Sequence, residues 1–355
     1  MTETDNIIID TTARIFSELG DPQTLNNASD DTWQRPLWTA LEDSGLTRAW
    51  VPEDQGGAGA EITDGFDILV TAGRYAVAVP LAETLLAGWL LAKAGIMMPD
   101  GPLSVAMGNA DNPFRINSDG SLSGTAKVVP FAGDVDHFTV LTDKGVALVK
   151  APDCTIETGV NMAGDAMSDV TFDGVKPTTV AIIPGGFGIK DLMLMGAAIR
   201  SAQMAGGLQA ILDLAVDYAK ERIAFGRPIS KFQAVQHNLA RLGGETAVAV
   251  AAAGSAADAI AKAEGANAHQ FDQAVFLEVA AAKIRTGEAV GDGTAIAHQT
   301  FGAIGFTSEH VLQRHTRRLW AWRDDYGSES EWAVRLGEMI AANGADELWP
   351  LIASR

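Results

Sequence analysis

Cysteine and positive charge are scarce in this 355-residue sequence, and each shortage excludes a class of site. Cys154 is the only cysteine, so an intrachain disulfide is impossible and a zinc site built from thiolates is excluded. Lys and Arg number 26 against 45 Asp and Glu, which gives a formal net charge of −19. Because nucleic-acid binding needs clustered basic side chains, this balance argues against a nucleic-acid surface.

Long apolar runs and metal-binding patterns are lacking as well. No apolar run approaches the length of a membrane span, and the acidic start lacks the basic and apolar regions of an export signal. The six histidines form no i, i+4 pair with a carboxylate, so no metal site is expected, and His298 is expected to cap a helix end. What remains, 47% hydrophobic and 20% charged residues, is typical of a globular protein, which we expect to be cytoplasmic.

Hydrophobic periodicity divides the chain into three segments. Residues 1–98 have helical spacing, 99–185 consist of short runs rich in Val, Thr, Ile and Phe, and 186–355 are helical again. The expected helices are 11–19, 33–42, 64–75, 81–94, 191–222, 231–263, 270–296, 308–323 and 329–343. The pattern predicts an α+β, mainly α protein in which a helical domain, a small β domain and a helical domain follow one another.

The most informative stretch is residues 222–242, RIAFGRPISKFQAVQHNLARL. A Gly and a Pro break two helical segments here, and Ser230 is predicted to be the N-cap of the second. The break brings Arg222, Phe225 and Gln233 around one turn, and a guanidinium, an aromatic face and an amide beside a helix start suit a pyrophosphate and a flat ring system. The alternative is a helical hairpin in which the Arg caps carbonyls and the Phe fills the core.

This stretch resembles the flavin-binding signature of the acyl-CoA dehydrogenase family. Other segments resemble the family in the right order, namely GLTRAWVPEDQGGAG at 45–59, the sequence at 73–95, HQTFGAIGF at 298–306 and RRLWAWRDDYGSE at 317–329. The resemblance covers nearly the whole chain. It implies the family fold, with an N-terminal helical domain, a middle β-barrel domain and a C-terminal four-helix bundle.

In this family FAD lies across a subunit interface, and the resemblance implies which residues hold it. Two groups are expected to contact the adenosine and pyrophosphate end of an FAD bound mainly by a neighbouring subunit. They are Arg222, Phe225 and Gln233 from the first signature, and Gln299, Gly302 and Ala303 from the second. Ala303 stands where the family has a glycine, and the alternative role of Gln299 is to cap the loop before Gly302.

The segments that bind the flavin ring in complete family members are not recognisable in this sequence. Complete members carry a Thr-Glu-Pro-Gly-x-Gly-Ser-Asp type loop followed by a Trp-containing strand, and residues 103–141 contain neither. A flavin ring needs backbone donors and a packed face, so this departure bears directly on where the ring is held.

The catalytic carboxylate is missing too. Proton abstraction beside a thioester carbonyl requires a carboxylate, and the resemblance places the family's two alternative Glu positions on Tyr326 and Gly196. Asp325 is the nearest candidate base. The alternative is that Asp325 is solvated or pairs with Arg317, Arg318 or Arg323.

These departures resemble the smaller, non-catalytic subunit of heterotetrameric α2β2 acyl-CoA dehydrogenases, which occur in bacterial breakdown of steroid side chains and other bulky acyl-CoA thioesters. The resemblance implies FAD as cofactor, a larger catalytic subunit that supplies the Glu, an acyl-CoA substrate and an electron-transferring flavoprotein as acceptor. Two alternatives stay open. One is a complete homotetrameric dehydrogenase with a displaced base, and the other is a non-enzymatic scaffold that binds no FAD.

Overall fold

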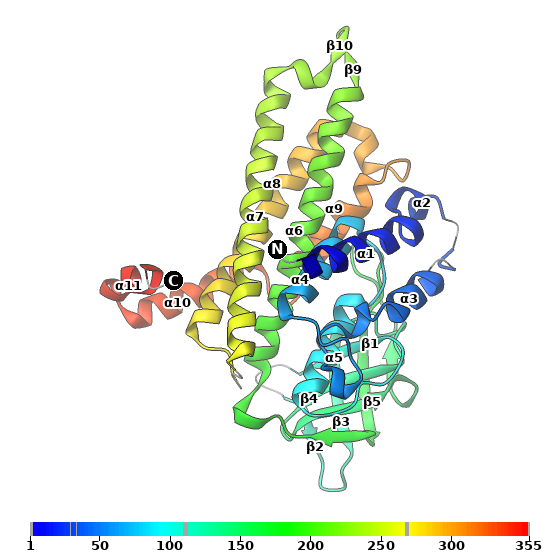
Figure 1. Ribbon diagram of the computed structural model, residues 1–355, viewed down its shortest axis with the longest axis vertical. Coiled ribbons are helices and arrows are strands. Elements are labelled where there is room, and N and C mark those ends of the chain that lie inside the picture. The colour runs from blue at the N-terminus through cyan, green and yellow to red at the C-terminus, as the bar shows by residue number, and fades with distance from the viewer. Residues whose placement is uncertain (1–2, 29, 33, 109–112, 267–269, 354–355) are drawn as a thin grey trace.

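The computed structural model describes the backbone of residues 3–28, 30–32, 34–108, 113–266 and 270–353. Five helices come first, in front of and beside the long bundle (Figure 1). They are α1 (Glu3–Leu19), α2 (Pro22–Asn26), α3 (Gln34–Asp43), α4 (Ile62–Tyr75) and α5 (Leu81–Lys93). Position 33, expected to open a helix, lies outside the described residues.

The middle domain consists of two four-stranded sheets that enclose an apolar core. In spatial order the first contains β1 (Leu103–Met107), β4 (His137–Thr142), β5 (Gly145–Lys150) and β8 (Thr179–Ala181). The second contains β2 (Arg115–Ile116), β3 (Leu122–Pro130), β7 (Met167–Val175) and β6 (Thr155–Glu157). Three phenylalanines, Phe114, Phe138 and Phe172, meet edge to face in this core, so the interior is filled by side chains.

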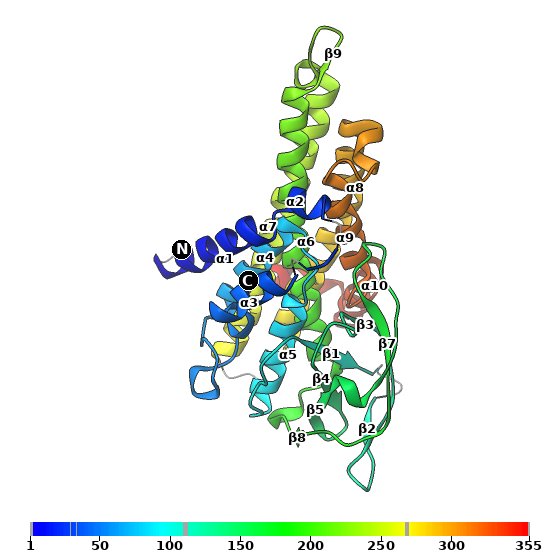
Figure 2. The ribbon, with the colours of Figure 1, turned by 90° about the vertical axis from the view of Figure 1, so that its right-hand side faces the viewer.

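The rest of the chain forms a helical bundle and a projecting arm (Figures 1 and 2). The bundle contains α6 (Ile189–Glu221), α7 (Gln233–Gly265), α8 (Gln273–Phe301) and α9 (Leu312–Asp324). The arm contains α10 (Glu329–Asn343) and α11 (Leu348–Ala353). Helix, sheet and helix therefore follow in the predicted order, and the predicted α+β, mainly α fold class is confirmed.

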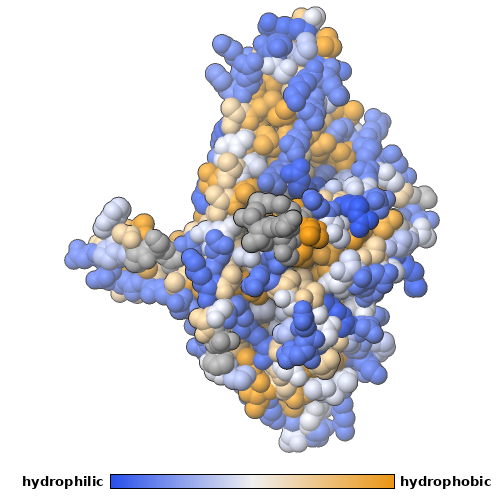
Figure 3. Space-filling view, in the orientation of Figure 1, coloured by the Kyte–Doolittle hydropathy of each residue, from blue (hydrophilic) through white to orange (hydrophobic). Residues whose placement is uncertain are grey.

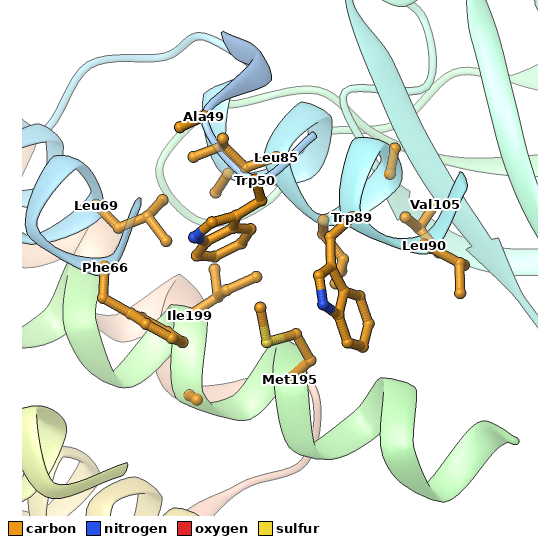
Figure 4. Close-up of a cluster of buried hydrophobic side chains, with 14 of the residues drawn as sticks. Ala49, Trp50, Phe66, Leu69, Leu85, Trp89, Leu90, Val105, Met195 and Ile199 are labelled. Carbon is orange, nitrogen blue, oxygen red and sulfur yellow. The ribbon is translucent and has the colours of Figure 1, made fainter. Parts of the chain in front are cut away.

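Helix α6 is the centre of the molecule because it packs against α4, α7, α8 and α9. A side chain at Gly206 would place its Cβ 1.9 Å from the carbonyl oxygen of Val70, so only glycine lets α4 and α6 approach this closely. Nearer the start of α6, Trp50 and Trp89 pack over Met195 and Ile199 (Figure 4). This cluster ties the N-terminal helices to the bundle.

Helix α7 has one face in the bundle and one face outward. Helix α7 is long and apolar enough to cross a membrane. Core helices of soluble proteins also meet this criterion of length and composition. In α7, 33% of the most apolar 18-residue window is buried. This differs from the prediction that no apolar run in the sequence approaches the length of a membrane span. Its outward face carries small and apolar residues such as Ala247, Val248 and Ala251, and Figure 3 shows apolar residues gathered over the bundle.

Candidate functional site

The first signature forms the tip of the hairpin between α6 and α7, at the end of the bundle far from the β domain (Figure 2). Two short strands, β9 (Ile223–Ala224) and β10 (Arg227–Pro228), pair across the tip, and Phe225 lies there with a φ of 51°. Helix α7 begins at Gln233 with Phe232 as its N-cap, so the prediction of Ser230 as N-cap was wrong. The reason is that residues 229–231 form a separate 3-10 turn before the helix.

The three predicted residues of this hairpin face solvent. Phe225 is 95% exposed and contacts Phe232 edge to face, while Arg222 and Gln233 are exposed. Within the described residues the Arg222 guanidinium has no ion pair or hydrogen bond, and its backbone N–H donates to the Tyr218 carbonyl at 2.8 Å. The alternative in which the Phe fills the core is therefore excluded. The Arg222 guanidinium and the Phe225 ring are both accessible to solvent.

The second signature lies at the same end of the bundle. Helix α8 ends at Phe301, and a short 3-10 helix, η6 (Gly302–Phe306), follows. The ring of Tyr218, one turn before Arg222, stacks on that of Phe301 with centroids 4.2 Å apart. Because Phe301 directly precedes Gly302, this contact holds the two signatures beside each other.

A pocket of about 500 Å³ opens next to the second signature and is lined by Gln299 and Gly302. Apart from the adjoining residues of its own segment, no heavy atom lies within 4 Å of the point where a Cβ at Gly302 would stand, and Ala303 is exposed, so the backbone here is open to a ligand. Gln299 is exposed and is one of the residues that line the pocket. The predicted trio of the second signature thus shares one accessible surface.

Three stacked rings form another wall of this pocket. His298 lies between Phe306, at 3.9 Å, and Trp320, at 5.7 Å, and its Nε2 is 3.0 Å from the Thr316 hydroxyl. Its side chain therefore does not cap a helix end as expected. Burial lowers the pKa of His298, and its Nδ1 is buried without a hydrogen-bond partner among the described residues. This stack could not be predicted from the sequence, because its members come from two helices and a turn.

The structure brings the two positions expected to carry a catalytic Glu into contact. A Cβ at Gly196, on α6, would lie 2.3 Å from a ring atom of Tyr326, in the turn after α9. The Tyr326 ring is therefore pressed against the helix backbone, and burial raises the pKa of its hydroxyl. Neither position offers a carboxylate.

Asp325, the candidate base, is held by Arg200, which is not among its predicted partners. It accepts a hydrogen bond from Arg200 Nε at 2.8 Å, and the same guanidinium donates to Glu83 at 2.6 Å and to Gln203. Burial lowers the pKa of Arg200, but Glu83 and Asp325 more than offset this and raise it above its ordinary value. The Asp325 carboxylate is therefore engaged in this network.

The arginines that had been named as alternative partners of Asp325 pair elsewhere. Arg323 pairs with Glu329, Arg318 with Asp165, and Arg317 donates to the carbonyl of Met162. A signal for the true partner was present, since Arg200 is the only charged residue between Asp191 and Asp213. A lone charge in an apolar helix needs a buried counterion.

A second buried cation, Lys283, lies close to the Tyr326 turn and bonds to the helix that precedes it. The Nζ of Lys283, on α8, is fully buried and donates to the Arg323 carbonyl at 2.6 Å, and burial lowers its pKa to about 8. Among the described residues no group of three potential metal ligands occurs. The region around Tyr326 is thus a packed ionic network.

The comparisons with known proteins agree with this architecture. Residues 186–323 match the family model described as acyl-CoA dehydrogenase, C-terminal domain. The acyl-CoA dehydrogenase FadE34 of Mycobacterium tuberculosis is 28% identical over 88% of this chain, which spans 43% of the length of FadE34. The acyl-CoA dehydrogenase IpdE2 of Mycolicibacterium smegmatis is 27% identical over 90% of this chain and 93% of its own length.

Solved structures share the fold over nearly the full length. The ChsE4-ChsE5 complex from Mycobacterium tuberculosis superposes with a TM-score of 0.84 at 23% identity, covering 97% of this chain and 99% of the other. The steroid ACAD Tcur3481-Tcur3483 gives a TM-score of 0.80 at 24% identity, with 96% and 98% covered. Residues 186–323 thus match the C-terminal domain of acyl-CoA dehydrogenases, and over nearly its full length the chain is similar to acyl-CoA dehydrogenases and shares their fold.

Proposed function

We propose that this chain is a subunit of an FAD-dependent acyl-CoA dehydrogenase that desaturates the α,β bond of an acyl-CoA thioester. In this proposal it holds the adenosine and pyrophosphate end of an FAD at a subunit interface. A larger partner of the same fold holds the flavin ring and supplies the catalytic Glu. Purified alone, the chain is expected to be inactive.

The observation that carries this proposal is a contrast within one molecule. Arg222, Phe225 and Gln233 are exposed, while the positions of the family base, Gly196 and Tyr326, are packed against each other. A subunit that binds a neighbour's cofactor needs exposed binding residues. A subunit with its own active site needs an accessible carboxylate at one of the base positions, and here those positions are packed against each other.

The residues at the bundle tip fit the nucleotide end of FAD. An unpaired guanidinium at Arg222 suits charge-assisted hydrogen bonds to a pyrophosphate. The Phe225 ring offers a flat apolar face, and Gln299 is one of the residues that line a pocket whose backbone is open at Gly302. FAD, when bound, supplies a hydride acceptor for the substrate's β-carbon, and this chain's residues bind and orient its nucleotide end.

The substrate and partners are inferred from the relatives. ChsE4-ChsE5 is a complex, and Tcur3481-Tcur3483 is a steroid ACAD. By analogy we assign a bulky acyl-CoA, such as a steroid side-chain thioester, an α2β2 assembly with a larger catalytic subunit, and an electron-transferring flavoprotein as acceptor.

Co-expression with a larger homologue of the same fold tests the proposal. We expect the pair to co-purify and to reduce an electron acceptor with a bulky acyl-CoA, while the chain alone gives no turnover. Turnover by the chain alone would instead indicate a complete homotetramer with a displaced base. A pair that assembles without FAD would indicate a scaffold.

A further inference from the structure

A cavity of about 470 Å³ lies where α9 meets the N-terminal helices and the β domain. Hydrogen bonds hold its walls in place. On one side, Gln313 of α9 donates to the Asn26 side chain of α2 at 3.0 Å. On the other, Arg317 of α9 donates to the Met162 carbonyl, in the loop between β6 and β7, at 2.7 Å. The cavity is thus formed by the fold itself, and it shares no lining residue with the pocket at Gly302.

The buried charges of the cavity wall are an ion pair and a single guanidinium. Arg318 is 4% exposed and pairs with Asp165, 6% exposed, and its Nε has no hydrogen-bond partner among the described residues. Arg314 lies one turn earlier and is half-buried, and within the described ranges its guanidinium makes no hydrogen bond or ion pair. Burial and Arg318 lower the pKa of Arg314 to about 10, so it is a cation at neutral pH. An unpaired cation in such a place is costly, and a ligand anion beside it offsets that cost.

Two carboxylates without a cation line the exposed side of the same cavity. They are Asp31 and Asp134, and neither side chain makes a hydrogen bond or ion pair with another described residue. Partial burial, with Asp31 and Asp165 nearby, raises the pKa of Asp134. Asp31 and Asp165 also act on Arg314, so unpaired groups of both signs face one cavity.

We propose that this cavity binds a small amino carboxylate, a molecule with a carboxylate at one end and an ammonium group at the other. The carboxylate accepts charge-assisted hydrogen bonds from Arg314, and the ammonium group donates to Asp31 and Asp134. Its methylene groups contact apolar lining residues such as Leu25 and Phe131. A cavity of about 470 Å³ is within the usual range for small-molecule sites.

Two simpler ligands fit these charges less well. A plain anion pairs with Arg314 but leaves Asp31 and Asp134 without a cation, in a chain whose formal net charge is −19. A plain amine pairs with the carboxylates and leaves Arg314 unpaired. A molecule that carries both charges satisfies both sides of the cavity, and this inference does not rest on the proposed function.

Thermal unfolding of the purified chain with a series of amino carboxylates tests the site. The probes are γ-aminobutyrate, δ-aminovalerate and ε-aminocaproate, each at about 10 mM and neutral pH, with valerate and butylammonium as matched molecules that lack one charge. We expect at least one amino carboxylate to raise the Tm by about 2 °C, because it binds the folded chain only, and the single-charge molecules to raise it by less than about 0.5 °C. No shift from any amino carboxylate, or an equal shift from valerate or butylammonium, would overturn the proposal.

Two substitutions locate the binding. Arg314→Met removes the guanidinium and keeps an apolar side chain, so the variant should fold, and calorimetry should show about tenfold or more weaker binding of the best probe. Asp134→Asn keeps the side-chain shape on the exposed side and should weaken binding by about threefold. Arg115→Met and Asp173→Asn are the controls and should leave the affinity unchanged, since both residues are exposed and lie outside the cavity wall. Unchanged affinity in Arg314→Met would show that the probe binds elsewhere and would contradict the site.

Discussion

The hairpin at Phe225 and the turn at Tyr326 both place a bulky aromatic residue in the left-handed region, with φ values of 51° and 56°, yet their surroundings are opposite. Phe225 is 95% exposed, whereas the Tyr326 ring is pressed against α6 and its turn is tied to three helices. Contacts within the chain explain the strain at Tyr326. At Phe225 the positive φ comes from the two-residue turn between β9 and β10, in which Gly226 is left-handed as well, so local turn geometry sets the backbone there.

The comparison also separates two uses of arginine. Arg222 stands exposed and unpaired among the described residues, while Arg200 is buried between Glu83 and Asp325. The first is available for intermolecular contacts and the second is committed to the fold. Substitutions in the two regions should therefore affect different properties.

Loss of the buried arginine is expected to have the largest effect. Arg200→Met leaves Glu83 and Asp325 buried without their counterion, so the free energy of unfolding should fall by about 3 to 5 kcal/mol, measured by urea denaturation. Arg285→Met is the matched control, because Arg285 pairs with Glu245 and Glu288 nearer the surface and should contribute under about 1 kcal/mol. Similar losses for the two variants would contradict the role of the network.

The free energy of unfolding should fall in acid because of His315, which lies on α9, the helix that precedes the Tyr326 turn. Burial lowers the pKa of His315, on α9, to about 4, and its Nε2 lies 3.0 Å from the Arg74 carbonyl. The unfolded chain, with an ordinary pKa near 6.5, then binds the proton more readily than the folded chain, so stability present above that pH is lost as pH falls. The free energy of unfolding should fall by about 3 kcal/mol between pH 6.5 and 4. His315→Gln should show a flatter curve over this window, and coincident curves would refute the assignment.

At the hairpin, substitution should weaken cofactor retention and leave the fold intact. Arg222→Ala removes charge-assisted contacts and should weaken flavin binding in the complex with the partner by about 1.5 to 3 kcal/mol. Lys220→Ala is the control. Lys220 is an exposed lysine two positions before Arg222, and it pairs with Asp217. Unchanged flavin retention in Arg222→Ala would count against its role.

The smallest expected effect on stability is that of Phe225→Gly. Because the ring is nearly fully exposed and glycine accepts a positive φ, the free energy of unfolding should change by less than about 0.5 kcal/mol. Tyr326→Gly should be far more costly despite the same relief of strain. A large loss at Phe225, measured by denaturation of the chain alone, would mean that the hairpin has a structural role within the subunit.

Much of the fold was predictable from the sequence, because helical periodicity and the β-type segment are local properties. The order of domains and most helix positions followed from them. The N-cap of α7 was not predictable, since the turn at residues 229–231 depends on how the hairpin closes, and Ser230 is a good N-cap residue by propensity alone.

Prediction of the candidate site was less complete, for reasons of distance along the chain. Motifs singled out Arg222, Phe225 and Gln299 as candidates, but the contact between Gly196 and Tyr326 joins residues that no local pattern relates. The partners of Asp325 were predicted from neighbours on its own helix, whereas the structure supplies Arg200 from α6. Such pairings depend on tertiary packing, and Arg200, the lone charge between Asp191 and Asp213, was the one sequence feature that pointed to them.

The most direct test of the central claim, that this subunit grips a cofactor whose ring lies in another chain, is the flavin content of the purified protein. The visible absorption spectrum should show no flavin for the chain alone and about one flavin per pair of chains for the complex with the larger homologue. A yellow homo-oligomer of this chain, with one flavin for every subunit, would contradict the account.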